Sequence, residues 1–308
     1  MTKGPKLNIF RAVAAFAAVA TLLAGCASAP EPPHEQAYSA SLLWQVEGAG
    51  SAPSYVLGTF HSSDARLRNL LPEVRRALDS SETAAFELQR NAEDDARLMR
   101  AVQQPEGRRL EDVLGPELFQ RTAAAVAKFG VPPEGAQRLT PLGLLPLLAY
   151  PRHELARMTF GEPVFDEWLQ REARRQGKAL HGLETYDEQI ALFGDMDAAE
   201  QVVLVSDLLN DHARVDAEFG RMLALYLAGD LEAIMAEAVD WSGTADVEAA
   251  ERFSRRLLDD RNRIMVARMT PLMQDGATFV AVGAAHLGGE VGVLSLLEQQ
   301  GFRVTRIN

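Results

Sequence analysis

The sequence predicts an α/β protein whose central sheet is built from both ends of the chain, with a large helical insertion between them. Two observations predict the sheet. Residues 54–88 and residues 277–307 each read as strand–helix–strand, because short apolar runs rich in β-forming residues flank an amphipathic segment. A third observation predicts the insertion, since residues 92–272 carry mostly helical patterns broken by proline and glycine.

The first strand–helix–strand unit begins with a short apolar run over 54–60, which predicts a buried strand. The run over 42–46 precedes it and is expected to pair with it as a hairpin. The segment 71–78 is amphipathic and has a proline in a favourable first-turn position, so it predicts a helix. The run over 83–88 predicts the second strand. A unit of this kind is expected to be parallel and right-handed.

The second half of the chain supplies the remaining elements of the sheet. The expected elements are a helix over 164–176, a strand over 177–183, further helices over 186–272, a strand over 277–283, a helix over 290–299 and a last strand over 302–307. Gly301 ends the last helix, as glycine often does just after a helix.

Composition excludes several classes of protein. The chain has 308 residues, of which 47% are hydrophobic and 24% charged, so it is neither largely disordered nor a polytopic membrane protein. Its net charge is −12, and an acidic protein repels phosphate backbones, so no nucleic acid is expected as a partner. The single cysteine excludes an intrachain disulfide and a cysteine-bound zinc or iron–sulfur centre.

The first forty residues read as a signal peptide and a tether rather than as part of the folded domain. Basic residues precede a small-residue apolar run over 12–23, which is shorter than the roughly 20 residues that span a membrane but suits a secretory signal. The run ends in Leu-Ala-Gly-Cys, which resembles a bacterial lipobox. The sequence therefore predicts a lipoprotein signal peptide over 1–25, a lipidated Cys26, and a flexible tether over 26–40.

The predicted signal peptide and lipidation site also predict where the protein is located in the cell. A lipidated Cys26 would anchor the protein to a membrane of the bacterial cell envelope, facing the periplasm. Ala27 follows the cysteine, where aspartate favours retention in the inner membrane, so the outer membrane is expected. The alternative is an ordinary signal peptide cleaved near Ala27 or Ala29.

Four polar side chains follow strand ends and form the candidate site. His61 and His286 each close a Gly-x-x-His motif at the end of a predicted strand, and Glu87 and Glu184 stand at the ends of two others. Ligands gather beyond the carboxyl ends of parallel strands, so these residues are expected to share one cleft. Two histidines with carboxylates suit zinc, manganese, cobalt or iron(II). The alternative is a pair of hydrogen-bonded loop histidines.

Three further residues are candidates for supporting roles. Arg261 either pairs with the acidic residues that precede it on the helix or orients a carboxylate of the site. Asn262 is expected to donate a hydrogen bond to a residue that itself binds the metal ion or substrate. Asp166 is expected to be a favourable negative charge at the N-terminus of its helix.

The chain resembles the TraB/GumN family, which includes PrgY and is related to the Tiki metalloproteases. The matching segments are Leu43-Trp44, Tyr55 to His61, Phe86-Glu87, Gly182 to Thr185 with Gln189, Asp260 to Asn262, Ala281 to Gly288 and Gly301 to Val304. The resemblance covers about residues 42–308, and it predicts one domain over 41–308 with its helical insertion at about 92–272. It implies a fold similar to erythromycin esterase and the lipoprotein ChaN.

The resemblance also implies a chemistry. Tiki proteins are manganese- or cobalt-dependent proteases that use both Gly-x-x-His motifs and a glutamate, and these roles carry over to His61, Glu87 and His286. Arg261 and Asn262 carry over as active-site support. The family often has Gly-x-Asp where this chain has Val164-Phe165-Asp166, so only the aspartate matches.

Three functions follow from these observations. The first is a lipid-anchored metallohydrolase that acts on a peptide or small-molecule substrate, with a peptidase as its narrower form. One carboxylate serves as general base, and Glu184 is a candidate because Glu87 is already a ligand. The second is a non-enzymatic periplasmic binding protein for a peptide, haem or metal, with the helical middle supplying an apolar groove. The third is a structural envelope lipoprotein, in which neither histidine carries a function.

Overall fold

The computed structural model describes residues 41–48, 52–69, 72–89, 92–211, 214–238, 252 and 254–307. The predicted signal peptide, Cys26 and the tether lie outside these residues. Within them, no helix combines the length and apolar character needed to cross a membrane.

A six-stranded mixed sheet forms the centre of the fold, which confirms the α/β class. Its strands are β1 (Leu43–Glu47), β2 (Ser54–Thr59), β3 (Thr83–Phe86), β4 (Ala179–Gly182), β5 (Thr278–Gly283) and β6 (Arg303–Arg306), in the order β4-β3-β5-β2-β1-β6. Strands β4, β3, β5 and β2 are parallel, whereas β1 runs antiparallel to both of its neighbours, β2 and β6. The hairpin expected at the start of the domain is therefore β1–β2.

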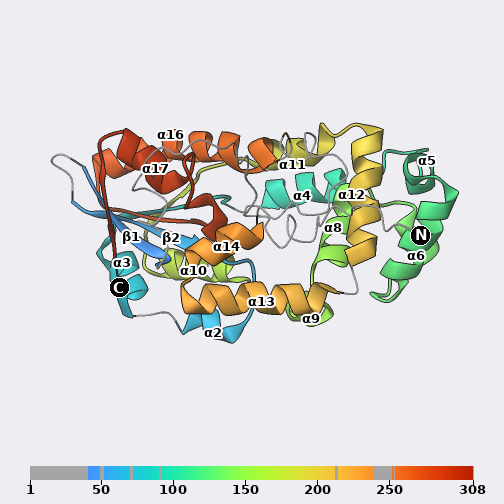
Figure 1. The fold of residues 1–308 in the computed structure, drawn as a ribbon, viewed down its shortest axis with the longest axis horizontal. Helices are drawn as coiled ribbons and strands as arrows, with labels where there is room; N and C mark the ends of the chain where they lie inside the picture. The colour runs from blue at the N-terminus through green and yellow to red at the C-terminus, as the bar shows by residue number, and fades with distance from the viewer. Residues whose placement is uncertain are drawn as a thin grey trace, which may run out of the picture.

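The two ends of the chain meet in the middle of this sheet. Strand β5, from the C-terminal part, pairs with β2 on one side and with β3 on the other, so the expected first strand–helix–strand unit is parallel but its strands are not adjacent. Every residue of β5 is buried, as is typical of a central strand with neighbours on both sides. Figure 1 shows the blue strands β1 and β2 on the same side of the molecule as the orange helix α16 and the red helix α17.

Helices cover the sheet and build a second region beside it. The helices are α2 (Ala65–Arg68), α3 (Pro72–Ser80), α4 (Ala92–Ala101), α5 (Leu110–Leu114), α6 (Pro116–Ala127), α7 (Pro133–Ala136), α8 (Pro141–Ala149), α9 (Arg152–Thr159), α10 (Phe165–Arg175), α11 (Tyr186–Gly194), α12 (Ala198–Asp211), α13 (Val215–Ala228), α14 (Leu231–Ala238), α16 (Asp260–Asp275) and α17 (Val293–Gln299), with a π-helix at Arg255–Asp259 and a 3-10 turn, η4, at Ala284–His286. The helices predicted over 164–176 and 290–299 correspond to α10 and α17.

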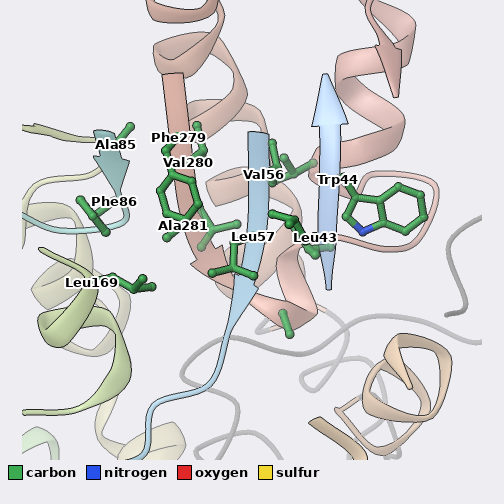
Figure 2. Close-up of a cluster of buried hydrophobic side chains, with 14 of the residues drawn as sticks. Leu43, Trp44, Val56, Leu57, Ala85, Phe86, Leu169, Phe279, Val280 and Ala281 are labelled. Carbon is green, nitrogen blue, oxygen red and sulfur yellow. The ribbon is translucent and has the colours of Figure 1, made fainter. Parts of the chain in front are cut away.

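Two clusters of buried apolar side chains stabilise these two regions. The first surrounds the sheet, and Figure 2 shows side chains of β1, β2, β3 and β5 within it, with Leu169 of α10 nearby. The second joins α5, α6, α8 and α12, where Leu110, Leu144 and Leu208 are fully buried. Tyr150, which follows α8, packs against both clusters. The helical region therefore has a core of its own that joins the sheet region at this tyrosine.

Candidate functional site

The four polar residues predicted at strand ends do follow parallel strands that end at one edge of the sheet. His61 comes just after β2, Glu87 directly after β3, Glu184 just after β4, and His286 ends the turn η4 that follows β5. Glu87, Glu184 and His286 are buried, whereas the side chain of His61 is 31% exposed. The sequence therefore placed these side chains at the correct edge.

A close backbone approach at Gly58 brings η4 against β2. A Cβ atom at this position would lie 2.9 Å from Cα of Ala284 and 2.8 Å from Cδ1 of Leu287. Only glycine leaves room for this contact without a shift of the turn. The glycine of the first Gly-x-x-His motif thus makes room for the turn η4, which carries the histidine of the second motif.

His286 is held as a neutral imidazole with one nitrogen free. Its Nδ1 lies 2.6 Å from Oδ1 of Asn262, and Nδ2 of Asn262 donates to the carbonyl oxygen of Val291 at 2.9 Å. Because a carbonyl only accepts, the amide orientation is fixed and Nδ1 of His286 must carry the proton. Burial lowers the pKa of His286, and the nearby charges of Arg261 and His61 lower it further. Nε2 therefore carries a lone pair, and it has no hydrogen-bond partner among the described residues.

The free nitrogen of His286 lies beside the carboxylate of Glu87. Nε2 of His286 is 3.8 Å from Oε1 of Glu87, which is too long for a hydrogen bond. The backbone N–H of Gly283 donates to the same oxygen, and Nη2 of Arg261 donates to Oε2 at 3.2 Å. Burial raises the pKa of Glu87, and the positive charge of Arg261 offsets part of this rise. A carboxylate and an unprotonated imidazole nitrogen thus face each other in a buried space.

Arg261 joins two of the predicted carboxylates. Its Nε and Nη2 donate to the two oxygens of Glu184, both at 2.7 Å, in addition to the bond from Nη2 to Glu87. Nε2 of Gln189 donates to Glu184 at 3.1 Å. Of the two interpretations of Arg261, the structure supports the one in which it orients carboxylates, since the intrahelical pair on α16 is instead formed by Arg263 with Asp260.

Asp166 is a residue of the site that the sequence interpretation missed. It lies in the first turn of α10, as expected, but its Oδ2 is also 3.4 Å from Nδ1 of His61. Both of these atoms are buried and lack a hydrogen-bond partner among the described residues. Oδ1 accepts a hydrogen bond from Thr59 at 2.5 Å. The aspartate shared with the resembling family was the signal that could have identified it.

Glu154 of α9 is a second residue that the sequence did not reveal. Its carboxylate is fully buried and accepts hydrogen bonds from Oγ of Ser62 at 3.0 Å and from both the backbone N–H and Oγ of Ser63 at 2.8 Å. These contacts fix the backbone directly after His61. No motif in the sequence links position 154 to position 61, so only the three-dimensional structure reveals this role.

The chemical types of the donor atoms at this site are those that bind divalent metal ions. A neutral imidazole nitrogen beside a carboxylate, with a second imidazole and carboxylate nearby, is a donor set that zinc, manganese or cobalt accepts. Orphaned buried atoms on His61, Asp166 and His286 are consistent with a missing partner of this kind. As they stand, no three histidine, cysteine or acidic side chains of the described ranges are grouped closely enough to hold an ion.

The chain is similar to proteins of one known family. A model of the TraB/PrgY/gumN family matches residues 42–306. Metalloprotease TIKI1 of Danio rerio is 26% identical in an alignment that covers 86% of this chain and 62% of that protein. Metalloprotease TIKI2 of Danio rerio is 24% identical, with 86% and 60% covered, and a metalloprotease TIKI homolog of Nematostella vectensis is 23% identical, with 86% and 66% covered.

The chain therefore spans less than two thirds of the length of these relatives. No solved structure matches it significantly. The expected likeness to erythromycin esterase and ChaN accordingly stays a prediction.

Proposed function

Because the chain belongs to the TraB/PrgY/gumN family, we propose that it is a metal-dependent hydrolase that cleaves peptides. The names of its relatives, which are metalloproteases, support the reaction class. The single observation that carries the proposal is the state of His286: a buried, neutral imidazole whose free Nε2 faces a buried carboxylate. Histidines that bind metal ions typically donate their other ring N–H to an oxygen, as Nδ1 of His286 does here to Asn262.

In this proposal His61, Glu87 and His286 hold the ion, and Asp166 stands beside His61. A divalent ion bound there would activate a water molecule or polarise a substrate carbonyl. Manganese, cobalt and zinc all suit these donors. Asp166 is added to the set expected from the sequence because its free Oδ2 lies within 3.4 Å of Nδ1 of His61.

The surrounding residues would position these groups. Asn262 keeps the proton of His286 on Nδ1 and so keeps Nε2 available. Two hydrogen bonds to Glu184 hold the guanidinium group of Arg261 in place, and a third orients Glu87. The positive charge of Arg261 balances the negative charge of these two carboxylates. Both oxygens of Glu184 are engaged by this arginine, so its contacts support a positioning role. A function of Glu184 as general base stays a prediction.

The location of this activity is also a proposal. We place the protein in the bacterial cell envelope, anchored to the outer membrane through a lipidated Cys26 and facing the periplasm. The support is the lipobox-like segment at 23–26, with the single cysteine of the chain at its end. The net charge of −12 supports a protein or peptide substrate over nucleic acid.

Metal analysis tests the proposal. The protein is purified without chelator, incubated with manganese, cobalt or zinc, and dialysed, and the bound metal is measured for wild type and for His61→Ala and His286→Ala. His153→Ala is the matched control, because His153 is 55% exposed on α9. Wild type and control are expected to retain metal, whereas the two site variants lose it. Equal and negligible metal in all four proteins would refute the proposal.

Peptide cleavage completes the test. A mixture of peptides is incubated with the metal-loaded protein, and the products are identified by mass spectrometry. New termini that disappear in His286→Ala are expected. Metal binding without any cleavage would instead favour the non-enzymatic binding protein.

A further inference from the structure

A cavity lies in the helical region next to the candidate site. It has a volume of about 320 Å³ and lies among α4, α8 and α11. Its walls are almost entirely apolar and include Leu98, Leu142, Pro146 and Ile190. This volume is at the lower end of the range for ligand pockets, which is about 300–1,000 Å³.

The cavity is not a packing defect of the core. Leu98, Leu142 and Ile190 are only partly buried, and Pro146 is exposed, so the cavity opens to solvent. The buried cluster of the helical region lies beneath it, with Leu145 contributing to both. Ligand sites are typically concave and lined mainly by apolar side chains with a few polar groups, as this cavity is.

Three residues of the cavity wall border the candidate site. Leu88 directly follows Glu87 in the chain. Gln189 lines the cavity and donates its hydrogen bond to Glu184, the partner of Arg261. Tyr150 is the third, and its pKa is raised by burial and by the nearby charge of Asp166. The cavity therefore runs alongside the carboxylates at the sheet edge.

We propose that this cavity is the specificity pocket of the hydrolase and takes one large apolar side chain of a peptide, such as leucine, isoleucine, methionine or phenylalanine. This inference rests on the proposed function. Gln189 and the hydroxyls of Tyr150 and Tyr186 are the polar groups of the wall. The amide of Gln189 is already bound to Glu184, so the wall favours an apolar group over a charged one. A peptide suits both features, because its side chain fills the apolar cavity while its polar backbone lies across the carboxylates and histidines outside.

Binding measurements test the pocket separately from turnover. Two pools of fluorescein-labelled hexapeptides are prepared, identical except that one varied position is Leu, Ile, Met or Phe in the first and Gly, Ala, Ser or Thr in the second. Binding to the metal-free and the metal-loaded protein is followed by fluorescence polarisation. The apolar pool is expected to bind about tenfold to a hundredfold more tightly, the ratio that burial of one large apolar side chain gives.

Two variants and one control locate the effect. Leu98→Trp fills the cavity and Ile190→Asn makes its wall polar, and each is expected to remove most of the preference for the apolar pool. Phe160→Ser is the control, because Phe160 is 86% exposed and does not line the cavity. It is expected to keep the wild-type preference. Circular dichroism confirms that each variant is folded.

The outcomes separate the pocket from the hydrolase. A preference lost in Leu98→Trp and Ile190→Asn but kept in Phe160→Ser supports the pocket even if no peptide is cleaved, and only the proposed function then fails. Peptide cleavage with equal binding of the two pools overturns the pocket and leaves the hydrolase standing. Failure of both pools to bind, or an unchanged preference in both pocket variants, also overturns the pocket.

Discussion

Arg261→Met is expected to destabilise the protein strongly, because it leaves two carboxylates in a buried site without their cation. The arginine side chain is 4% exposed and donates three hydrogen bonds to Glu87 and Glu184, and a fourth to the carbonyl of Leu257. Methionine keeps most of the apolar stem but none of the donors. The substitution therefore isolates the electrostatic contribution of the guanidinium group.

The expected loss of stability is about 3–5 kcal/mol, the usual cost of removing one partner from a buried ion pair. Two oxygens of Glu184 and one of Glu87 lose a donor together, which places the value in the upper part of that range. The loss should also depend on pH. Without Arg261, the pKa of Glu87 rises further, so protonation relieves the buried charge. The stability gap between variant and wild type is expected to narrow as the pH falls from 7 to 5.

The assay is thermal unfolding of the protein at pH 7 and pH 5, with Arg263→Met as the matched control. Arg263 stands on the same helix and its side chain is 54% exposed in an ion pair with Asp260, so its replacement should cost no more than about 1 kcal/mol. Arg261→Met is expected to lower the Tm by about 6 °C or more at pH 7. If both variants unfold within about 2 °C of each other, the argument that Arg261 balances buried charge is wrong.

Three further predictions concern the surroundings of the site. Asn262→Ala removes the acceptor that holds the proton of His286 on Nδ1, so metal affinity measured by titration should fall about 10–100-fold. Gly58→Ala forces the turn η4 away from β2; thermal unfolding should show a loss of about 1–3 kcal/mol, together with reduced metal binding. Hydrogen bonds from Arg268 lower the pKa of Glu188 to about 2, so this pair stabilises the fold above pH 4.5 and its contribution is lost as the pH falls towards 2. Glu188→Gln should accordingly reduce the change in Tm between pH 5 and pH 2, and an unchanged pH profile would contradict this.

The sequence was sufficient for features that depend on local pattern. The strands ending before His61, Glu87 and His286 follow from short apolar runs, and their carboxyl ends place these side chains at one edge of the sheet. The close approach at Gly58 also depends on a local feature, because only glycine allows this backbone contact without a Cβ atom in the way.

Features that depend on distant contacts could not be predicted from the sequence. Nothing local determines that β5 lies between β2 and β3, since this order depends on which strand is buried on both faces and edges. The partner of Arg261 was ambiguous because acidic residues precede it on the helix, and the choice depends on where α16 packs. Glu154 was missed because a glutamate on a helix ordinarily indicates an exposed face.

Three residues of the candidate site, which follow strands, are held in position by contacts from helices. Glu154 of α9 fixes the backbone after His61, Arg261 of α16 fixes Glu87, and Asn262 of α16 fixes the ring of His286. The strands contribute one further contact, from the backbone N–H of Gly283 in β5 to Glu87. The helices that lie between β3 and β5 in the chain thus supply contacts that orient the donors, from α9 and α16, and also the walls of the apolar cavity, from α4, α8 and α11. A substitution in α9 or α16 should therefore act on the site as directly as one in a strand.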